Sequence, residues 1–399
     1  MIKVGVVFGG ETVEHEVSII SAVQAMNKMD NEKYDIIPIY ITKDGEWYTG
    51  QLLRDIETYK DMDLVKRYTK NVVLYNKNGR FVLQNKNLFK SIVSDIDIIF
   101  PIVHGTNVED GVLQGYLKTI GVPFVGSNVL ASAVAQDKVV QKQVFECSKL
   151  PITKYHWFYD CDYLDDADKV VKEIEKQLTY PMIVKPATLG SSVGISSVDN
   201  KKELISAIED AIQYDNKIVV EEKVSNLVEV NISVLGNYEN FKLSEIEEVI
   251  TDNSLLTYED KYIGCGKKSN TGSKGMASAS RRIPAKIDNK LKEEVESIAS
   301  SAFRSVGLSG VCRIDFLIDK KKKNVYINEI NSCPGSLAFY LWDAKDKSFT
   351  SLLDDMINIA IKDYKKNKSK IRSFNSNILS GFNGLKGSKG KLGKFGKLK

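Results

Sequence analysis

Apolar residues in the first third of the chain follow two periodicities. Mostly apolar segments cover residues 2–8, 35–41 and 96–103, whereas the segment 17–29 repeats apolar residues at helical spacing. Short apolar segments of this kind are typical of strands, and their alternation with a helical pattern is typical of α/β sheets. The pattern therefore predicts a first α/β domain over residues 1–136.

Two further units follow with the same mixture of periodicities. Residues 137–221 combine a helical segment, a short strand, a glycine-containing loop and a second helix. Residues 222–364 contain the apolar segments 311–318 and 325–327 and close with a long helical pattern. The sequence therefore predicts an α/β (α+β) protein of three units, followed by a tail of different character at 365–399.

Composition indicates a soluble enzyme. A chain of 399 residues with 43% hydrophobic content is long enough for two or three domains with real cores. No apolar run approaches the roughly 20 residues that span a bilayer, and the first residues read as a strand and not a signal peptide, so we expect a cytoplasmic protein. Five scattered cysteines without a CxxC pair indicate neither a zinc site nor a disulfide framework.

The positive charge of the chain is concentrated in the tail. Residues 365–399 carry eleven Lys and Arg and no acidic residue, so removing their charge from the net +4 leaves −7 for the rest. A basic balance confined to a tail argues against a specific nucleic-acid enzyme. Two interpretations of the tail stay open: weak electrostatic contact with an anionic surface, or a dispensable solubilising extension.

Two apolar segments near the end of the third unit carry a candidate metal site. Glu329 and Asn331 follow the run VYI, and Arg313 and Asp315 lie in VCRIDFLI. Since strand side chains alternate between faces, each pair should project to one side. Three oxygen ligands without a nearby His or Cys suit a hard ion such as Mg²⁺. The alternative is two edge strands with solvated polar ends.

A glycine-containing loop, KPATLGSSVG at 185–194, has the chemistry of a phosphate-binding segment. Gly190 and Gly194 permit close backbone approach, and Lys185 offers a point charge. The loop matches neither the P-loop nor the GxGxxG pattern. A plain Gly-Ser hairpin turn is the alternative.

Three glutamates after this loop suggest a nucleotide-binding edge. Glu221, Glu222 and Glu229 lie in a stretch rich in β-branched residues. The backbone at 221–224 could pair with an adenine edge while Glu229 accepts from ribose hydroxyls. The alternative is that these are ordinary solvent-exposed glutamates of a strand, without a role in nucleotide binding.

The chain resembles the D-alanine–D-alanine ligase family of the ATP-grasp superfamily from about residue 3 to about residue 364. The resemblance implies a Rossmann-like N-terminal domain followed by a two-lobed ATP-grasp fold, whose lobes would be residues 137–221 and 222–364. Seven motifs carry it in order: GGETVEHEVSIISA (9–22), HGTNVEDGVLQGYL (104–117), GVPFVGSNVLASAVAQDK (121–138), KPATLGSSVG (185–194), TYEDKY (257–262), RIDF (313–316) and NEINSCPG (328–335).

The resemblance also implies cofactors and the residues that bind them. ATP would be the cosubstrate, with two Mg²⁺ ions, or Mn²⁺ in their place, held by Asp315, Glu329 and Asn331. The nucleotide and its phosphates would be bound by further matching residues: Lys138, Lys185, Ser192, Glu222, Glu229 and Lys261.

The implied reaction transfers the γ-phosphoryl group of ATP to a carboxylate, and an amine then attacks the acyl phosphate. Clustered cations stabilise the negative charge of both steps, and no side-chain nucleophile is needed. Glu14 would hold the ammonium group of the first substrate and would be linked through Ser191 to Tyr262. Arg313 and the Gly335 amide would stabilise the oxyanion and orient the second substrate. Residues 264–280 are interpreted as a closing lid or as a disordered surface loop.

The sequence departs from the family pattern at two places. After Pro334-Gly335, Phe339 or Tyr340 stands where the family usually has a serine that binds the carboxylate of the second substrate, within an aromatic stretch that ends at Trp342. The alternative is that these side chains fill core. Val108 stands where a glycine is usual.

Three functions therefore stay open. The first is a D-alanine–D-alanine ligase for peptidoglycan precursors that takes small-molecule substrates. The second is a sister ligase with another acceptor, and the third is a non-catalytic nucleotide-binding protein. The family is usually dimeric, so we expect a homodimer.

Overall fold

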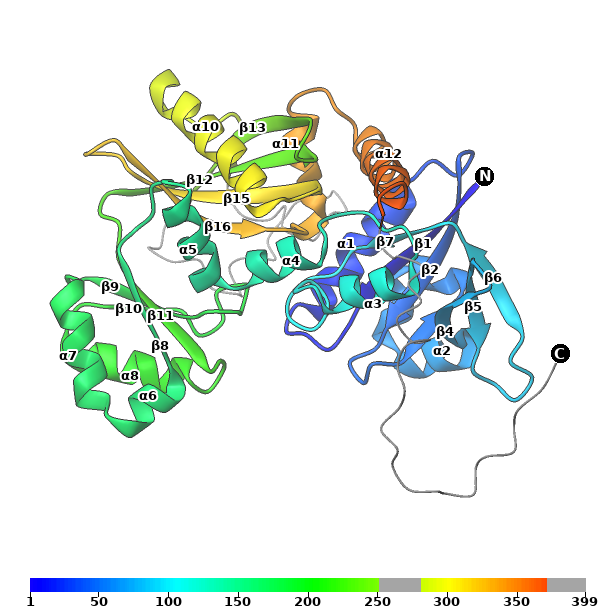
Figure 1. Cartoon of the computed structure of the whole chain (residues 1–399), viewed down its shortest axis with the longest axis horizontal. Helices are drawn as coiled ribbons and strands as arrows, with labels where there is room; N and C mark the ends of the chain where they lie inside the picture. Colours follow the sequence, from blue (N-terminus) through cyan, green and yellow to red (C-terminus); the bar gives the residue numbers. More distant parts are fainter. Residues whose placement is uncertain (251–280, 372–399) are drawn as a thin grey trace, which may run out of the picture. The chain divides into compact units, whose positions relative to one another are not determined.

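The computed structural model describes residues 1–250 and 281–371, and these build three β-sheets (Figure 1). Residues 1–362 form one compact unit. Each sheet draws its strands from one of the three units expected from the sequence. In the described part of the chain, no helix is long and apolar enough to cross a membrane.

The first sheet has seven strands in the order β6-β5-β4-β3-β2-β1-β7. Only β1, β2 and β7 run parallel, and the remaining pairs are antiparallel, which the apolar runs alone did not predict. The strands are β1 (Ile2–Gly9), β2 (Tyr34–Ile41), β3 (Trp47–Thr49), β4 (Lys70–Lys77), β5 (Arg80–Asn85), β6 (Ile92–Ile96) and β7 (Ile98–Pro101). The associated helical segments are α1 (His15–Lys28), η1 (Gln51–Arg54), η2 (Ile56–Lys60), α2 (Met62–Tyr68) and α3 (Val112–Ile120).

The second sheet is antiparallel, in the order β10-β9-β11-β8. Its strands are β8 (Tyr155–Tyr159), β9 (Met182–Pro186), β10 (Ser196–Val198) and β11 (Lys217–Glu222). Its own core is closed by α6 (Asp160–Asp165), α7 (Ala167–Gln177) and α8 (Lys201–Ala211).

The third sheet is antiparallel, in the order β14-β13-β12-β15-β16. Its strands are β12 (Leu227–Gly236), β13 (Phe241–Val249), β14 (Arg281–Arg282), β15 (Gly310–Asp319) and β16 (Asn324–Asn331). The helices that follow or cover it are α4 (Val129–Gln136), α5 (Lys138–Cys147), α10 (Asn289–Val306), η4 (Gly335–Ala338), α11 (Phe339–Asp343) and α12 (Phe349–Lys368). Helix α5, expected in the second unit, packs its Phe145 into the core of this third sheet.

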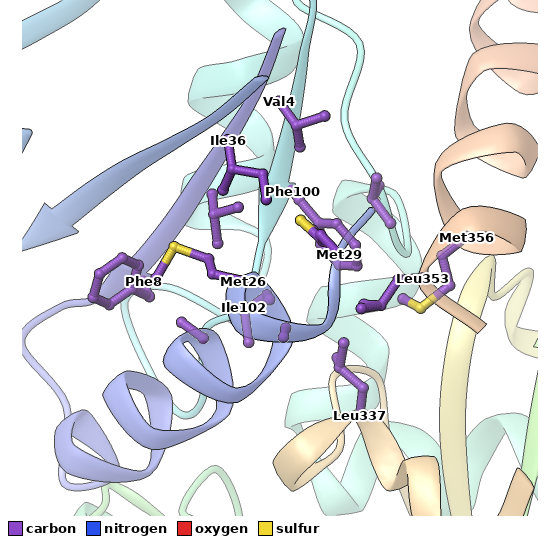
Figure 2. Packing of buried hydrophobic residues seen from close by; sticks show 14 of the residues in the cluster. Val4, Phe8, Met26, Met29, Ile36, Phe100, Ile102, Leu337, Leu353 and Met356 are labelled. Atoms are coloured by element: carbon purple, nitrogen blue, oxygen red, sulfur yellow. The ribbon is translucent and has the colours of Figure 1, made fainter. Parts of the chain in front are cut away.

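A shared core ties the first sheet to the end of the third unit. Figure 2 shows Met26 of α1 and Phe100 of β7 in one apolar cluster with Leu337 of η4 and Met356 of α12. Burial of these apolar side chains stabilises the position of η4 relative to α1. Each Å² of apolar surface removed from water contributes roughly 25 cal/mol. This matters for function because η4 begins at Gly335.

Candidate active site

One cavity brings together residues of the second and third sheets with residues from the segments that follow β1 and β7 of the first sheet, and every predicted site residue in the described part of the chain lines it. These residues are Glu14, Lys138, Lys185, Ser191, Ser192, Glu221, Glu222, Glu229, Arg313, Asp315, Glu329, Asn331 and Gly335. Lys261, Tyr262 and the segment 264–280 lie outside the described residues.

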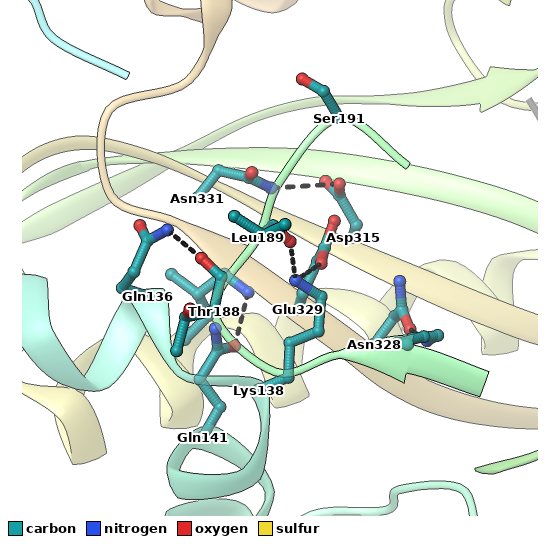
Figure 3. Close-up of polar contacts among 12 residues, drawn as sticks. Gln136, Lys138, Gln141, Thr188, Leu189, Ser191, Asp315, Asn328, Glu329 and Asn331 are labelled. Atoms are coloured by element: carbon teal, nitrogen blue, oxygen red, sulfur yellow. Dashed lines mark hydrogen bonds and ion pairs between the residues drawn. The ribbon is translucent and has the colours of Figure 1, made fainter. Parts of the chain in front are cut away.

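The candidate metal ligands come from two paired strands. In the β15–β16 register, Asp315 lies opposite Glu329 and Arg313 opposite Asn331. Arg313 donates from Nε and Nη2 to the two carboxylate oxygens of Asp315 at 2.7 Å. Asn331 Nδ2 donates to Asp315 Oδ2 at 3.1 Å (Figure 3). The pair with Asp315 raises the already high pKa of Arg313, although burial opposes its charge.

The donor set fits a hard ion. The carboxylates of Asp315 and Glu329 and the amide of Asn331 line the same cavity, and Mg²⁺ prefers oxygen ligands of these kinds. Within residues 1–250 and 281–371, no cluster of three or more His, Cys, Asp and Glu side chains is suited to a metal. The third protein ligand would therefore have to be the amide oxygen of Asn331.

Lys138 connects this cluster to the glycine-containing loop. The side chain of Asp137 caps the first turn of α5 by accepting from Val139 N and Val140 N, so Lys138 begins the helix at the cleft. Its Nζ donates to Leu189 O at 2.6 Å and lies 3.6 Å from Glu329 Oε2 (Figure 3). The lysine thus lies between the loop and the candidate metal ligands.

The loop needs its glycine because of a close carboxylate. A Cβ on Gly190 would lie 2.7 Å from Glu14 Oε2. Ser191, with φ of 56°, donates a short hydrogen bond from its hydroxyl to Glu14 Oε1. The structure thus contains the first contact of the expected link from Glu14 through Ser191.

A buried charge network lies behind the loop. Glu221 accepts from Lys185 Nζ at 3.0 Å, lies 3.0 Å from Lys142 Nζ and accepts from Thr153 Oγ1 at 2.8 Å. Burial opposes ionisation of Glu221, but the two ammonium groups keep its pKa well below the usual range. Burial lowers the pKa of Lys142. The Glu221 side chain therefore pairs with two lysines in the interior, while its prediction as part of a nucleotide-binding edge stays a prediction.

Glu109 and His104 connect the first sheet to the loop after β16. Glu109 accepts from Cys333 N at 2.9 Å and Gly105 N at 3.0 Å. Burial and the charge of Glu14 raise the pKa of Glu109 to about 7. His104 Nδ1 lies 2.8 Å from Cys333 O, and burial lowers its pKa to about 4, so it is neutral and positions this loop.

The aromatic stretch after Gly335 divides between core and cleft. Phe339 stacks on Phe349 with ring centroids 4.6 Å apart, and Trp342 Nε1 donates to Ser233 Oγ at 3.0 Å in the interior. Tyr340 lines the cleft. Phe339 and Trp342 therefore pack in the core, whereas Tyr340 lies at the wall of the cleft.

Comparison with known proteins decides the family. A model described as the N-terminus of D-Ala–D-Ala ligase matches residues 3–127, and the corresponding C-terminal model matches residues 144–358. The chain belongs to the D-alanine–D-alanine ligase family.

Individual relatives agree with this assignment. The chain is 39% identical over 379 residues, 95% of its length and 98% of the relative's, to the D-alanine–D-alanine ligase of Thermosipho melanesiensis. Among solved structures, the D-alanine–D-alanine ligase from Coxiella burnetii has a TM-score of 0.76 at 28% identity, covering 92% of this chain and 97% of that one. The VanG D-Ala:D-Ser ligase from Enterococcus faecalis has a TM-score of 0.74 at 29% identity, covering 90% and 99%. The prediction of an ATP-grasp ligase fold is confirmed.

Several residues in this ligase's cleft, and Lys142 in the buried network behind it, were missed by sequence reasoning. Glu109 lies inside the quoted motif HGTNVEDG, and Lys142 lies one helical turn after Lys138, so the signals were present but not used. Glu247 and Arg281 also line the cleft, and no motif indicated them.

Replacing Glu109 by Gln is expected to flatten the dependence of stability on pH. Because the pKa rises from 4.5 to about 7 on folding, the folded ligase binds more protons between these values. Its free energy of unfolding therefore falls as pH rises through this window, by up to about 3 kcal/mol, and levels off above it. Urea unfolding at pH 5 and pH 8 measures the difference between the two proteins. An equal change in both would contradict the assignment.

Proposed function

We propose that this ligase joins two D-alanine molecules through an acyl phosphate, at the expense of ATP, to give the dipeptide of peptidoglycan precursors. The observation that carries the proposal is one cleft in which Lys138 and Lys185 lie beside the group Arg313, Asp315 and Glu329. Negative charge would develop first on the transferring phosphoryl oxygens and then on the oxygen of a tetrahedral carbon. Cations near both groups of atoms would stabilise phosphoryl transfer followed by acyl transfer.

The first step would form the acyl phosphate. The carboxylate of the first D-alanine attacks the γ-phosphorus, the O–P bond to ADP breaks, and ADP leaves. Lys138 and Lys185 would hold the phosphates, and Glu14 would hold the ammonium group of this D-alanine. Asp315, Glu329 and Asn331 would hold two Mg²⁺ ions, which neutralise phosphate charge when bound.

The second step would form the peptide bond. The amine of the second D-alanine attacks the acyl carbon and the C–N bond forms. The C–O bond to phosphate breaks, its electron pair leaves with phosphate, and the proton that the amine loses passes to that phosphate or to water. Arg313 and the Gly335 N–H would stabilise the oxyanion. The geometry of η4 supports this role: Ser336, Leu337 and Ala338 adopt left-handed conformations directly after Gly335, at a cost of roughly 1–2 kcal/mol each. The buried cluster around Leu337 stabilises this turn.

The test is ADP release with Mg²⁺ and ATP across a panel of D- and L-amino acids, with products identified by mass. We expect D-alanine alone to support turnover and to give D-alanyl-D-alanine. Turnover only with a second amino acid, such as D-serine, would identify a sister ligase. No turnover with any amino acid would favour the non-catalytic interpretation.

The proposal also includes the location of the protein, its oligomeric state and its division into structural units. We expect a cytoplasmic homodimer of three structural units, 1–136, 137–221 and 222–364. The basic tail, of which residues 372–399 lie outside the described residues, would at most add weak contact with anionic surfaces.

A further inference from the structure

A second arginine lies in the same cleft as Arg313, and its neighbours determine its position. Arg281 NH1 lies 3.3 Å from Glu247 Oε2, and its guanidinium carbon lies 4.1 Å from the centre of the Tyr340 ring. Tyr340 Oη donates to Glu247 Oε1 at 3.1 Å, and Asn231 Nδ2 donates to the same oxygen at 2.9 Å. All four side chains line the cleft.

The two arginines contact carboxylates in different geometries. Arg313 makes two 2.7 Å hydrogen bonds to Asp315. Arg281 lies 3.3 Å from Glu247, which also accepts from Tyr340 and Asn231. Glu247 and the Tyr340 ring thus hold the Arg281 guanidinium at the wall of the cleft. Burial and Glu247 raise the pKa of Tyr340 to about 12, so its hydroxyl remains a donor at neutral pH.

We propose that Arg281 binds the α-carboxylate of the acceptor amino acid and that Tyr340 holds the guanidinium in place for it. This inference rests on the proposed function. In the second step the acceptor's amine must face the acyl phosphate near Arg313 and Gly335, so its carboxylate must lie elsewhere in the cleft. A carboxylate left unpaired in a part-buried cleft is costly, and the planar fork of an arginine is the partner that suits it.

The consequence is a requirement for a free carboxylate on the acceptor. D-Alaninamide has the same amine and methyl group but no carboxylate charge. We expect the ligase to prefer D-alanine over D-alaninamide by about 10- to 100-fold in kcat/KM, the range for a hydrogen bond to a charged group. In Arg281→Ala this ratio should fall towards one, through a higher acceptor KM for D-alanine.

Hydroxylamine supplies a readout that does not involve the acceptor carboxylate. It attacks the acyl phosphate of the first D-alanine, releasing phosphate and giving a hydroxamate. Hydroxamate formation should therefore be unchanged in Arg281→Ala, which also shows that the variant is folded. If the alanine variant does not fold, Arg281→Gln removes the charge and keeps a planar group near Tyr340.

Arg282 provides the matched control. It is the next residue of β14, pairs with Glu248 Oε2 at 3.0 Å, and its side chain is 47% exposed. Arg282→Ala should keep the preference for D-alanine over D-alaninamide.

The outcomes separate the inference from the function on which it rests. Dipeptide synthesis with undiminished preference for D-alanine in Arg281→Ala would overturn the role of Arg281 while leaving the ligase activity standing. Absence of both hydroxamate and dipeptide in the wild type would overturn the proposed function, and the inference with it.

Discussion

A Glu329→Gln variant is expected to lose about 10²- to 10³-fold in kcat for ADP release while keeping its fold. Glu329 is one of two carboxylates in the candidate metal set, and it lies 3.6 Å from Lys138. Glutamine keeps the size and hydrogen-bonding capacity but removes the charge that attracts a divalent cation. Steady-state kinetics over a range of Mg²⁺ concentrations measures the effect, with ATP affinity recorded with and without Mg²⁺.

Tyr326→Phe is the control on the same strand. Its hydroxyl contacts Asn324 at the exposed far end of β16, so activity should stay within about twofold of wild type. Near-normal turnover in Glu329→Gln, with an unchanged Mg²⁺ requirement, would remove Glu329 from the metal site.

Glu221→Leu should cause the largest loss of stability, about 3–5 kcal/mol. The substitution removes the carboxylate that compensates Lys142 and Lys185, and the Lys142 side chain is only 1% exposed. Because the folded pKa of Glu221 lies below its usual 4.5, its stabilisation is complete above about pH 4.5 and is lost at lower pH. Urea unfolding at pH 7 and pH 4 measures both effects.

Two companion variants sharpen this result. Glu222→Ala, at the next position of β11, removes a partly exposed ion pair with Lys154 and should cost less than about 1 kcal/mol. The double variant Glu221→Leu with Lys142→Met removes one uncompensated ammonium group and should recover part of the lost stability. Equal losses in Glu221→Leu and Glu222→Ala would show that the buried network is not important for folding.

The candidate metal group was predictable because its geometry is local. Strand periodicity placed Glu329 and Asn331 on one face, and the same rule paired Arg313 with Asp315, as the 2.7 Å contacts show. At the glycine loop, the residue type alone predicted a close approach to the backbone at Gly190, and it was expected from a phosphate. The close neighbour in the structure is the Glu14 carboxylate, which the sequence did not indicate.

The remaining features depend on contacts between residues far apart in the chain. The periodicity of the sequence does not predict that Glu221 pairs with Lys142 or that Glu109 accepts from Cys333 N after β16. In each pair the two residues lie on different elements. The aromatic stretch makes the same point: neighbouring residues with similar chemistry divide between the core, at Trp342, and the cleft, at Tyr340. Local sequence determines which face of a strand a residue occupies, whereas only the packing of sheets and helices decides what lies opposite that face.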